Sequence, residues 1–170
     1  MTIQEEQLIM AAAEYDDGDA KRIQHFIKVH DLAVTIATGE KVGEDMLHVL
    51  STATILHDIG IHEAERKYNN GSGHYQEIEG PAVARELMDK VGGYTPEVQE
   101  RVCWLIAHHH HVNEICDLDH QILVEADYLV NIYEDDMSAD AVRHIEKRVF
   151  KTDTGLRLLR SMYAGLLPAE

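Results

Sequence analysis

Four places along the chain hold histidine or carboxylate side chains where the helical spacing of apolar residues would otherwise continue. They are His25, the pair His57-Asp58, the run His108–His111 and Asp127. Imidazole nitrogens and carboxylate oxygens bind borderline divalent cations such as Mn, Fe, Co, Ni or Zn. The chain has no cluster of cysteines, which argues against a structural zinc site. We therefore predict a catalytic centre that holds one or two divalent transition-metal ions with open coordination positions.

Asp127 is the most informative of these residues because it shares a helical face with apolar neighbours. Leu123 and Val124 lie four and three positions before it, and Val130 lies three positions after it. Residues at these spacings are neighbours on a helix. A carboxylate on a buried face is unfavourable unless it is paired with a cation or bound to a metal. A salt bridge or a helix cap is the alternative interpretation of Asp127, whereas Glu125 lies on a different face and is expected to be solvated.

The other candidates are weaker when each is taken alone. His57-Asp58 follows the run STATIL of small or apolar residues at a helix end. Adjacent helical residues point about 100° apart, so such a pair serves two metals, or one metal from two directions, when the helix end lies beside the site. The alternative is Asp58 as a helix-terminal hydrogen-bonding group with His57 packed in the core. The run His108–His111 sweeps around the helix, so at most two of its imidazoles are expected to face a metal.

Helices must position these side chains, because the sequence indicates helices and no sheet. No run alternates apolar and polar residues far enough to suggest a strand. Apolar spacing, caps and glycine stops instead predict eight helices, with the histidine run at the end of the fifth. Their approximate ranges are 3–15, 19–39, 43–60, 81–92, 95–106, 119–133, 138–149 and 153–166. We expect a single all-α domain over residues 1–170.

Composition limits the classes of partner. A length of 170 residues is sufficient for one domain with a sizeable core. The formal net charge of −16 argues against nucleic-acid polymers and anionic membranes, whose binding relies on clustered lysine and arginine. No apolar stretch approaches the length of a membrane span, and the N-terminus has no basic region or cleavage site. The two cysteines, Cys103 and Cys116, suggest no disulfide framework, so we expect a protein of the reducing cytoplasm, and a homodimer is left open.

The order His25, His57-Asp58, Asp127 resembles the H…HD…D signature of the HD-domain superfamily of metal-dependent phosphohydrolases. The segment RIQHFIKVHDLA is similar to the helix of its first ligand, ATILHDIG to its central motif, and ILVEADYLVN to the helix of its last aspartate. The resemblance covers residues 19–133 and leaves 138–166 as C-terminal helices. It implies a helical bundle of the HD type with a metal site in its middle, where a metal-activated water attacks phosphorus.

The resemblance also implies roles for the signature residues. His25, His57, Asp58 and Asp127 would hold the first metal, and Asp58 would act as the catalytic residue that bridges two metals if both are present. Relatives with a second metal carry further ligands before the last aspartate. The segment CWLIAHHHH matches one such location and implies a second-metal ligand there. By this resemblance His109 is the first choice for that ligand, and His110 or His108 is the expected companion.

A second location, HYQEIEGPAVA, departs from the pattern of these relatives. Gln76 stands four positions before Gly80, where many relatives carry a histidine. Either Glu79 or His74 substitutes for that ligand, or the second metal is loosely held. Ile61 stands where many relatives carry a lysine that contacts phosphate.

The cations expected to replace this lysine lie near the glycine-containing segment. They are Lys67, Arg66 and Arg85, for which ordinary solvated surface charge is the alternative interpretation. The expected partner is a small phosphorylated substrate, and the expected reaction is hydrolysis of a nucleotide or another small phosphate ester. A di-iron oxygenase, which the same scaffold supports, and a non-catalytic nucleotide- or metal-sensing module are the alternatives.

Overall fold

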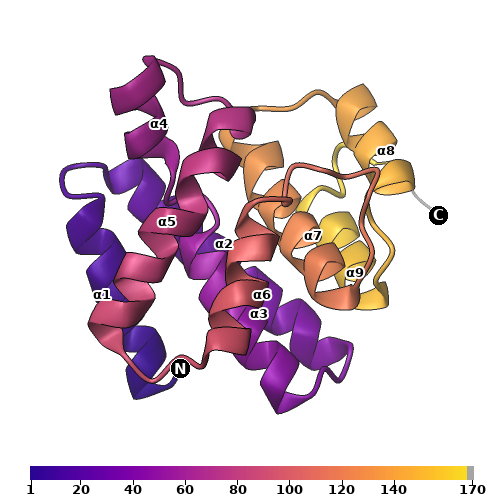
Figure 1. The fold of residues 1–170 in the computed structure, drawn as a ribbon. Coiled ribbons are helices and arrows are strands. Elements are labelled where there is room, and N and C mark those ends of the chain that lie inside the picture. The colour runs from indigo at the N-terminus through magenta and orange to yellow at the C-terminus, as the bar shows by residue number, and fades with distance from the viewer. Residues whose placement is uncertain (168–170) are drawn as a thin grey trace.

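The computed structural model describes residues 1–167, and within them the chain forms nine α-helices and no β-strand (Figure 1). Residues 168–170, the end of the predicted domain, lie outside the described residues. The predicted all-α fold is confirmed. The helices are α1 (Ile3–Tyr15), α2 (Ala20–Gly39), α3 (Glu44–Leu56), α4 (Ile61–Tyr68), α5 (Gly73–Val91), α6 (Pro96–Ile106), α7 (Leu118–Glu134), α8 (Ala139–Arg148) and α9 (Asp153–Met162).

Polar side chains cap many of these helices where the sequence places them. Thr2 forms a capping box at the start of α1, and the side chain of Asp19 accepts a hydrogen bond from a backbone nitrogen in the first turn of α2. Thr95, Ser138 and Thr152 cap α6, α8 and α9 in the same way. Each cap satisfies a backbone nitrogen that has no partner within its own helix. These local signals explain why most helix ends were predictable.

The largest differences from the expectation concern two helices, and α3 and α9 also end four residues before their predicted limits. The sequence predicts no helix over residues 61–68, which form α4, and it places the start of the next helix at Pro81, whereas α5 begins at Gly73. Within α4 only Ala64 is buried, so this helix lacks an apolar stripe that would predict it. A proline inside a helix costs about 3 kcal/mol, which made Pro81 a favoured first residue. Packing of α5 against α1, α4 and α6 offsets that cost.

Helices α2 and α3 form the centre of the bundle. Helix α2 packs against α1, α3, α7 and α9, while α3 packs against α1, α2, α6 and α7. Figure 1 shows α1, α4 and α5 on one side of this centre and α7, α8 and α9 on the other. The residues at 51–56 of α3 are all buried, and most of them are small, which allows neighbouring helices to approach closely. No described helix is long and apolar enough to cross a membrane.

A close backbone approach fixes the turn after α3. A Cβ atom added at Gly60 would lie 2.6 Å from the backbone nitrogen of Gly80 in α5. One added at Gly80 would lie 2.6 Å from Cγ2 of Ile106, the last residue of α6. Only glycine fits at either position without movement of its neighbours. This contact holds the end of α3 against α5 and α6.

The expectation that Glu125 is solvated is wrong. Its side chain is fully buried, and it accepts hydrogen bonds from the backbone nitrogens of Lys151 and Thr152 at 2.6 and 2.9 Å. The hydroxyl of Thr152 and the amide of Gln121 also donate to it, at 2.5 and 2.7 Å. Helix α7 packs against α2 and α3 and also against α9, so it buries more than the one face that apolar spacing revealed.

We predict that Gly60→Ala destabilises the protein, because its methyl group meets backbone atoms that cannot rotate away. Overpacking of this kind lowers the free energy of unfolding by about 1–3 kcal/mol. Urea unfolding monitored by circular dichroism measures the change. Gly165→Ala is the matched control, because Gly165 is exposed and has no atom within 4 Å of an added Cβ. Equal unfolding midpoints for the two variants would contradict the prediction.

Candidate metal centre

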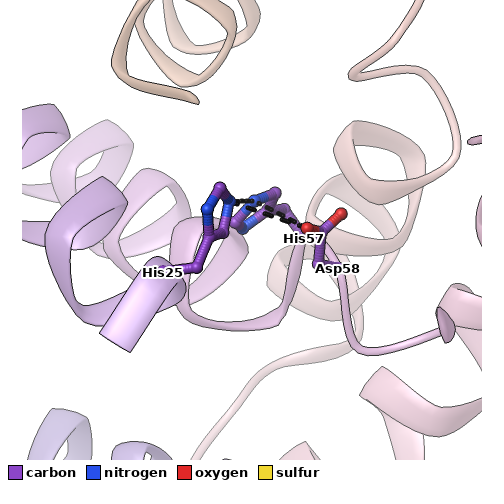
Figure 2. Close-up of side chains that lie close together, drawn as sticks. All are labelled: His25, His57 and Asp58. Carbon is purple, nitrogen blue, oxygen red and sulfur yellow. Dashed lines mark hydrogen bonds and ion pairs between the residues drawn. The ribbon is translucent and has the colours of Figure 1, made fainter. Parts of the chain in front are cut away.

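Side chains from three segments converge at the C-terminal end of α3. His25 comes from α2, His57 and Asp58 from the turn after α3, and Asp127 from α7. Nε2 of His25 lies 3.2 Å from Nε2 of His57 and 3.2 Å from Oδ1 of Asp127. Oδ2 of Asp58 lies 3.6 Å from Nε2 of each of these two histidines. Figure 2 shows His25, His57 and Asp58 pointing toward one another. The structure thus brings all four signature residues together.

His109 joins this group from the end of α6. Its Nε2 lies 3.5 Å from Oδ1 of Asp58, and its ring centroid lies 5.4 Å from that of His57. Asp58 therefore directs one oxygen toward His25 and His57 and the other toward His109. Ligand atoms of His25, His57 and Asp58 lie within 4.8 Å of one another, and so do those of Asp58, His109 and His110. Asp58 is the residue common to the two groups.

Hydrogen bonds outside the cluster orient its imidazoles. Nδ1 of His57 donates to the carbonyl of Thr54, and Nδ1 of His109 donates to the carbonyl of Ile106, both at 2.8 Å. Nδ1 of His25 lies 3.1 Å from Oε2 of Glu134. In each ring the proton on Nδ1 leaves Nε2 free to accept a proton or a metal ion at the centre.

His108 points away from the cluster. Its ring stacks on Trp104 with centroids 4.2 Å apart, and its Nδ1 donates to the Trp104 carbonyl at 2.7 Å. The carbonyl of His108 accepts a hydrogen bond from Nε2 of His120 at 3.0 Å. These contacts fix the start of the histidine run, and the next residue, His109, enters the core.

His110 and His111 are exposed and are held by Glu77 of α5. Oε1 of Glu77 lies 3.4 Å from Nδ1 of His110, and Oε2 lies 3.2 Å from Nε2 of His111. The backbone nitrogen of His110 donates to the same carboxylate at 3.2 Å. The ligand atoms of His110 lie within 4.8 Å of those of Asp58 and His109, whereas His108 and His111 are in neither ligand group, so His110 is the companion of His109 that the geometry favours.

The remaining second-metal candidates do not reach the cluster. The oxygens of Glu79 accept hydrogen bonds from Lys67 and from the hydroxyl of Tyr68, the latter at 2.8 Å. His74 is exposed, and its ring contacts Tyr75. Gln76 donates through Nε2 to the carbonyl of Gly71 at 2.6 Å. Helix α5 thus contributes to the site through Glu77, which the sequence reasoning did not single out.

The expected phosphate contacts also lie elsewhere. Lys67 pairs with Glu79, and Nη2 of Arg66 lies 2.6 Å from Glu63. Arg85 donates to Gln99 at 3.4 Å. None of these three cations is among the described residues that line the open cleft beside His25 and Asp58. The cleft has a volume of about 300 Å³, and the lysine and arginine side chains that line it, together with Ile61, are Lys21 and Arg22.

Electrostatics favour positive charge at the centre of the cluster. Burial would lower the pKa of His25, but its hydrogen bond with Asp127 and the charges of Asp127 and Asp58 raise the pKa to about 9. Burial would also lower the pKa of His57, but the pKa is raised, mainly by the charge of Asp58. The imidazoles in turn hold the pKa of each carboxyl far below its usual range, although burial opposes this. The two carboxylates therefore stabilise a proton or a metal cation among the imidazoles.

The donor atoms fit a divalent cation. Ligand atoms bound about 2.1 Å from one ion at tetrahedral or octahedral angles lie about 3.0–3.4 Å apart. The separations from Nε2 of His25 to His57 and to Asp127 are both 3.2 Å. Nε2 of His109 is buried without a hydrogen bond, opposite a carboxylate oxygen that is also an acceptor. Two facing acceptors require a proton or a metal cation between them, and these atoms are of the types that bind a divalent transition metal.

Sequence reasoning missed Glu134 and Arg22, although helical spacing contains the signal for both. Glu134 follows Asp127 by seven residues, which is about two helical turns. Arg22 precedes His25 by three residues and therefore shares its helical face. A search for polar residues one or two turns from each predicted ligand would have found them.

Comparisons with known proteins agree with this geometry. The family model described as the HD domain matches residues 22–132, well over half of the chain. A predicted HD superfamily hydrolase from an uncultured Thermotogales bacterium has a crystal structure that matches with a TM-score of 0.66 and 24% sequence identity, over 95% of this chain and 86% of that chain. No curated protein matches the chain. Because the match spans the segments that carry His25, His57-Asp58 and Asp127, the chain belongs to the HD domain family, a family of metal-dependent hydrolases.

Proposed function

We propose that this protein hydrolyses the phosphate ester of a nucleotide or another small metabolite and that it uses one or two divalent transition metals. The observation that carries the proposal is that His25 and Asp58 line an open cleft of about 300 Å³. A small molecule in this cleft reaches the ligand cluster directly, whereas His57 and His109 stay buried. The volume is at the lower end of the range for small-molecule sites, about 300–1,000 Å³, which favours a small substrate.

The side chains of the cluster divide the work. A divalent cation bound there would polarise a phosphoryl oxygen and lower the pKa of a water molecule. His25, His57, Asp58 and Asp127 would hold the first ion, and His109 and His110 would join Asp58 around a second. Asp58 lines the cleft, and its side chain is 26% exposed, more than that of His25, His57 or Asp127.

Arg22 is the candidate phosphate contact in the cleft. Its Nε lies 3.3 Å from Oδ2 of Asp19, and its Nη2 donates to Oε1 of Glu65 at 2.8 Å. Its Nη1 is buried and has no hydrogen-bond partner. The two carboxylates hold the planar guanidinium at the wall of the cleft, and a rotation of the side chain would bring the unpaired Nη1 to an anionic oxygen. Arg22 would thereby supply the cation that is missing at Ile61.

Charge in the cleft limits what binds there. Five carboxylates and only two lysine or arginine side chains line it, so an anionic substrate is repelled in the absence of metal. Bound divalent ions reverse that potential locally. The charge of −16 acts over a longer range against nucleic-acid polymers and anionic membranes. We therefore favour a small phosphorylated partner whose binding depends on metal.

A di-iron oxygenase is the second candidate, because Asp58 lies between two groups of ligand atoms, an arrangement that suits a pair of ions.

We predict that protein purified without chelator releases phosphate from nucleotides or small phosphate esters when Mn²⁺ or Co²⁺ is added. Elemental analysis and a colorimetric phosphate assay measure this. Coloured protein that contains two irons and lacks phosphatase activity would favour oxygen chemistry. Tight nucleotide binding without phosphate release over hours would favour a sensing module.

Asp127→Ala is expected to remove the first metal and the activity. Loss of a hydrogen-bonding partner behind a metal ligand weakens metal affinity by about 10–100-fold, and loss of a ligand itself costs more. We therefore predict a decrease of at least about 100-fold in kcat/KM, together with loss of metal measured by elemental analysis. His111→Ala serves as the control because His111 lies outside both ligand groups. Full metal content and turnover in Asp127→Ala would refute the site assignment.

Arg22→Gln is expected to lower kcat/KM by about 10–100-fold, because a hydrogen bond to a charged group contributes about 1.5–3 kcal/mol. Metal content should stay unchanged, since Arg22 is not a ligand. Steady-state kinetics with the best substrate of the phosphatase screen measure the effect. Arg157→Gln is the charge-matched control, because Arg157 is exposed and does not line the cleft. Equal kinetics for the two variants would exclude Arg22 as a phosphate contact.

A further inference from the structure

His25 differs from the other imidazoles of the cluster in what holds its second ring nitrogen. His57 and His109 follow the ends of α3 and α6, where the carbonyls of the last turn have no partner within the helix. Nδ1 of each ring donates to such a carbonyl at 2.8 Å. His25 lies inside α2, where the backbone carbonyls accept hydrogen bonds from the helix itself. The acceptor for its Nδ1 must therefore come from another part of the chain.

Glu134, the last residue of α7, is that acceptor. Its Oε2 lies 3.1 Å from Nδ1 of His25, and its Oε1 pairs with Nζ of Lys28, one turn further along α2. The Glu134 side chain is only 10% exposed. Asp127 lies two turns earlier on α7, and its Oδ1 is 3.2 Å from Nε2 of His25. One face of α7 thus places a carboxylate against each nitrogen of the same imidazole.

We propose that Glu134 is a positioning residue that sets the affinity of the first metal site through His25. A carboxylate that accepts the Nδ1 proton fixes the tautomer and the orientation of the ring, and it makes Nε2 a stronger electron donor to the metal. Lys28 holds the second oxygen of Glu134 and so maintains the carboxylate in this orientation. The inference rests on the metal site of the proposed function and not on its substrate.

A purely structural role is the alternative. The pair between Lys28 and Glu134 joins α2 to α7, and the Lys28 side chain is 44% exposed. Exposed ion pairs contribute about 0–1 kcal/mol to stability. If this were the whole role of Glu134, its removal would lower the melting temperature slightly and leave metal affinity unchanged. Metal affinity therefore separates the two interpretations.

The experiment titrates the metal-free protein with Co²⁺ in competition with a chelator and records the visible absorption of the bound ion. Glu134→Ala is expected to raise the Kd for Co²⁺ by about 10–100-fold and to shift the absorption bands. Glu134→Gln should have a smaller effect, because its amide oxygen still accepts the Nδ1 proton but carries no charge. Lys28→Met should weaken binding less than Glu134→Ala does.

Asp135→Asn is the matched control. Asp135 is the next residue, is exposed and lines the same cleft, so this variant removes the same charge at nearly the same place. We expect it to change the Kd for Co²⁺ by less than about twofold, since screening by water weakens its effect on the ion. Thermal unfolding of every variant reports any loss of stability separately from metal affinity.

Wild-type Co²⁺ affinity and absorption in both Glu134 variants would overturn the inference. Equal weakening by Asp135→Asn would also overturn it, because the effect would then belong to the net charge of the cleft. If Glu134→Ala does not fold, the isosteric Glu134→Gln carries the test. Wild-type protein that binds no Co²⁺ would exclude both this inference and the proposed function, whereas protein that binds Co²⁺ but releases no phosphate would exclude only the function.

Discussion

The rest of the structure depends on bringing three imidazoles and two carboxylates together at one point inside a helical bundle. Buried charges are unfavourable unless they are paired, and removal of one partner from such a group costs about 3–5 kcal/mol. Here the carboxylates of Asp58 and Asp127 face the Nε2 atoms of the imidazoles. Each outer nitrogen has its own acceptor, so the rings are oriented before any ion binds. The complete cluster is therefore stable, whereas a cluster that lacks one of its charged side chains leaves the others buried without a partner.

Backbone geometry provides this convergence. The buried segment at the end of α3 is rich in small side chains, and the contact between Gly60 and Gly80 fixes the turn that carries the HD pair. The end of α6 is fixed in a different way. Arg101 binds Asp119 of α7 through two hydrogen bonds of 2.6 and 2.8 Å, which closes the loop that contains the histidine run. His109 can enter the core because both ends of its loop are held.

Burial differs among the side chains of the candidate metal centre. His57 and His109 are almost completely buried, whereas Asp58 faces the cleft beside Arg22. An acidic cleft in an acidic protein would repel phosphate, so the chemistry that we propose requires the metal both for binding and for reaction. The same carboxylates that favour a cation in the cluster thereby make substrate binding conditional on that cation.

The sequence by itself determined the helical class, most helix ends and the four signature residues, because these depend on local spacing and capping. Asp127 was conspicuous since a carboxylate on an apolar face needs a partner wherever that face packs. The sequence did not predict α4, because only Ala64 of this helix is buried. It also did not predict the first turns of α5, because Pro81, which lies inside this helix, is a residue typical of a helix N-terminus. Such elements form through tertiary packing, which no local pattern reports.

Only the tertiary structure decided which histidine of the run faces inward and which residues surround the cluster. Successive residues of the run point in different directions, and contacts with Trp104 and Glu77 select His109. Lys67, Arg66 and Arg85 looked available in the sequence, yet they lie away from the cleft that Arg22 lines. Glu134 meets His25 only because α2 packs against α7. Contacts between distant segments depend on how helices dock, and a linear pattern does not contain that information.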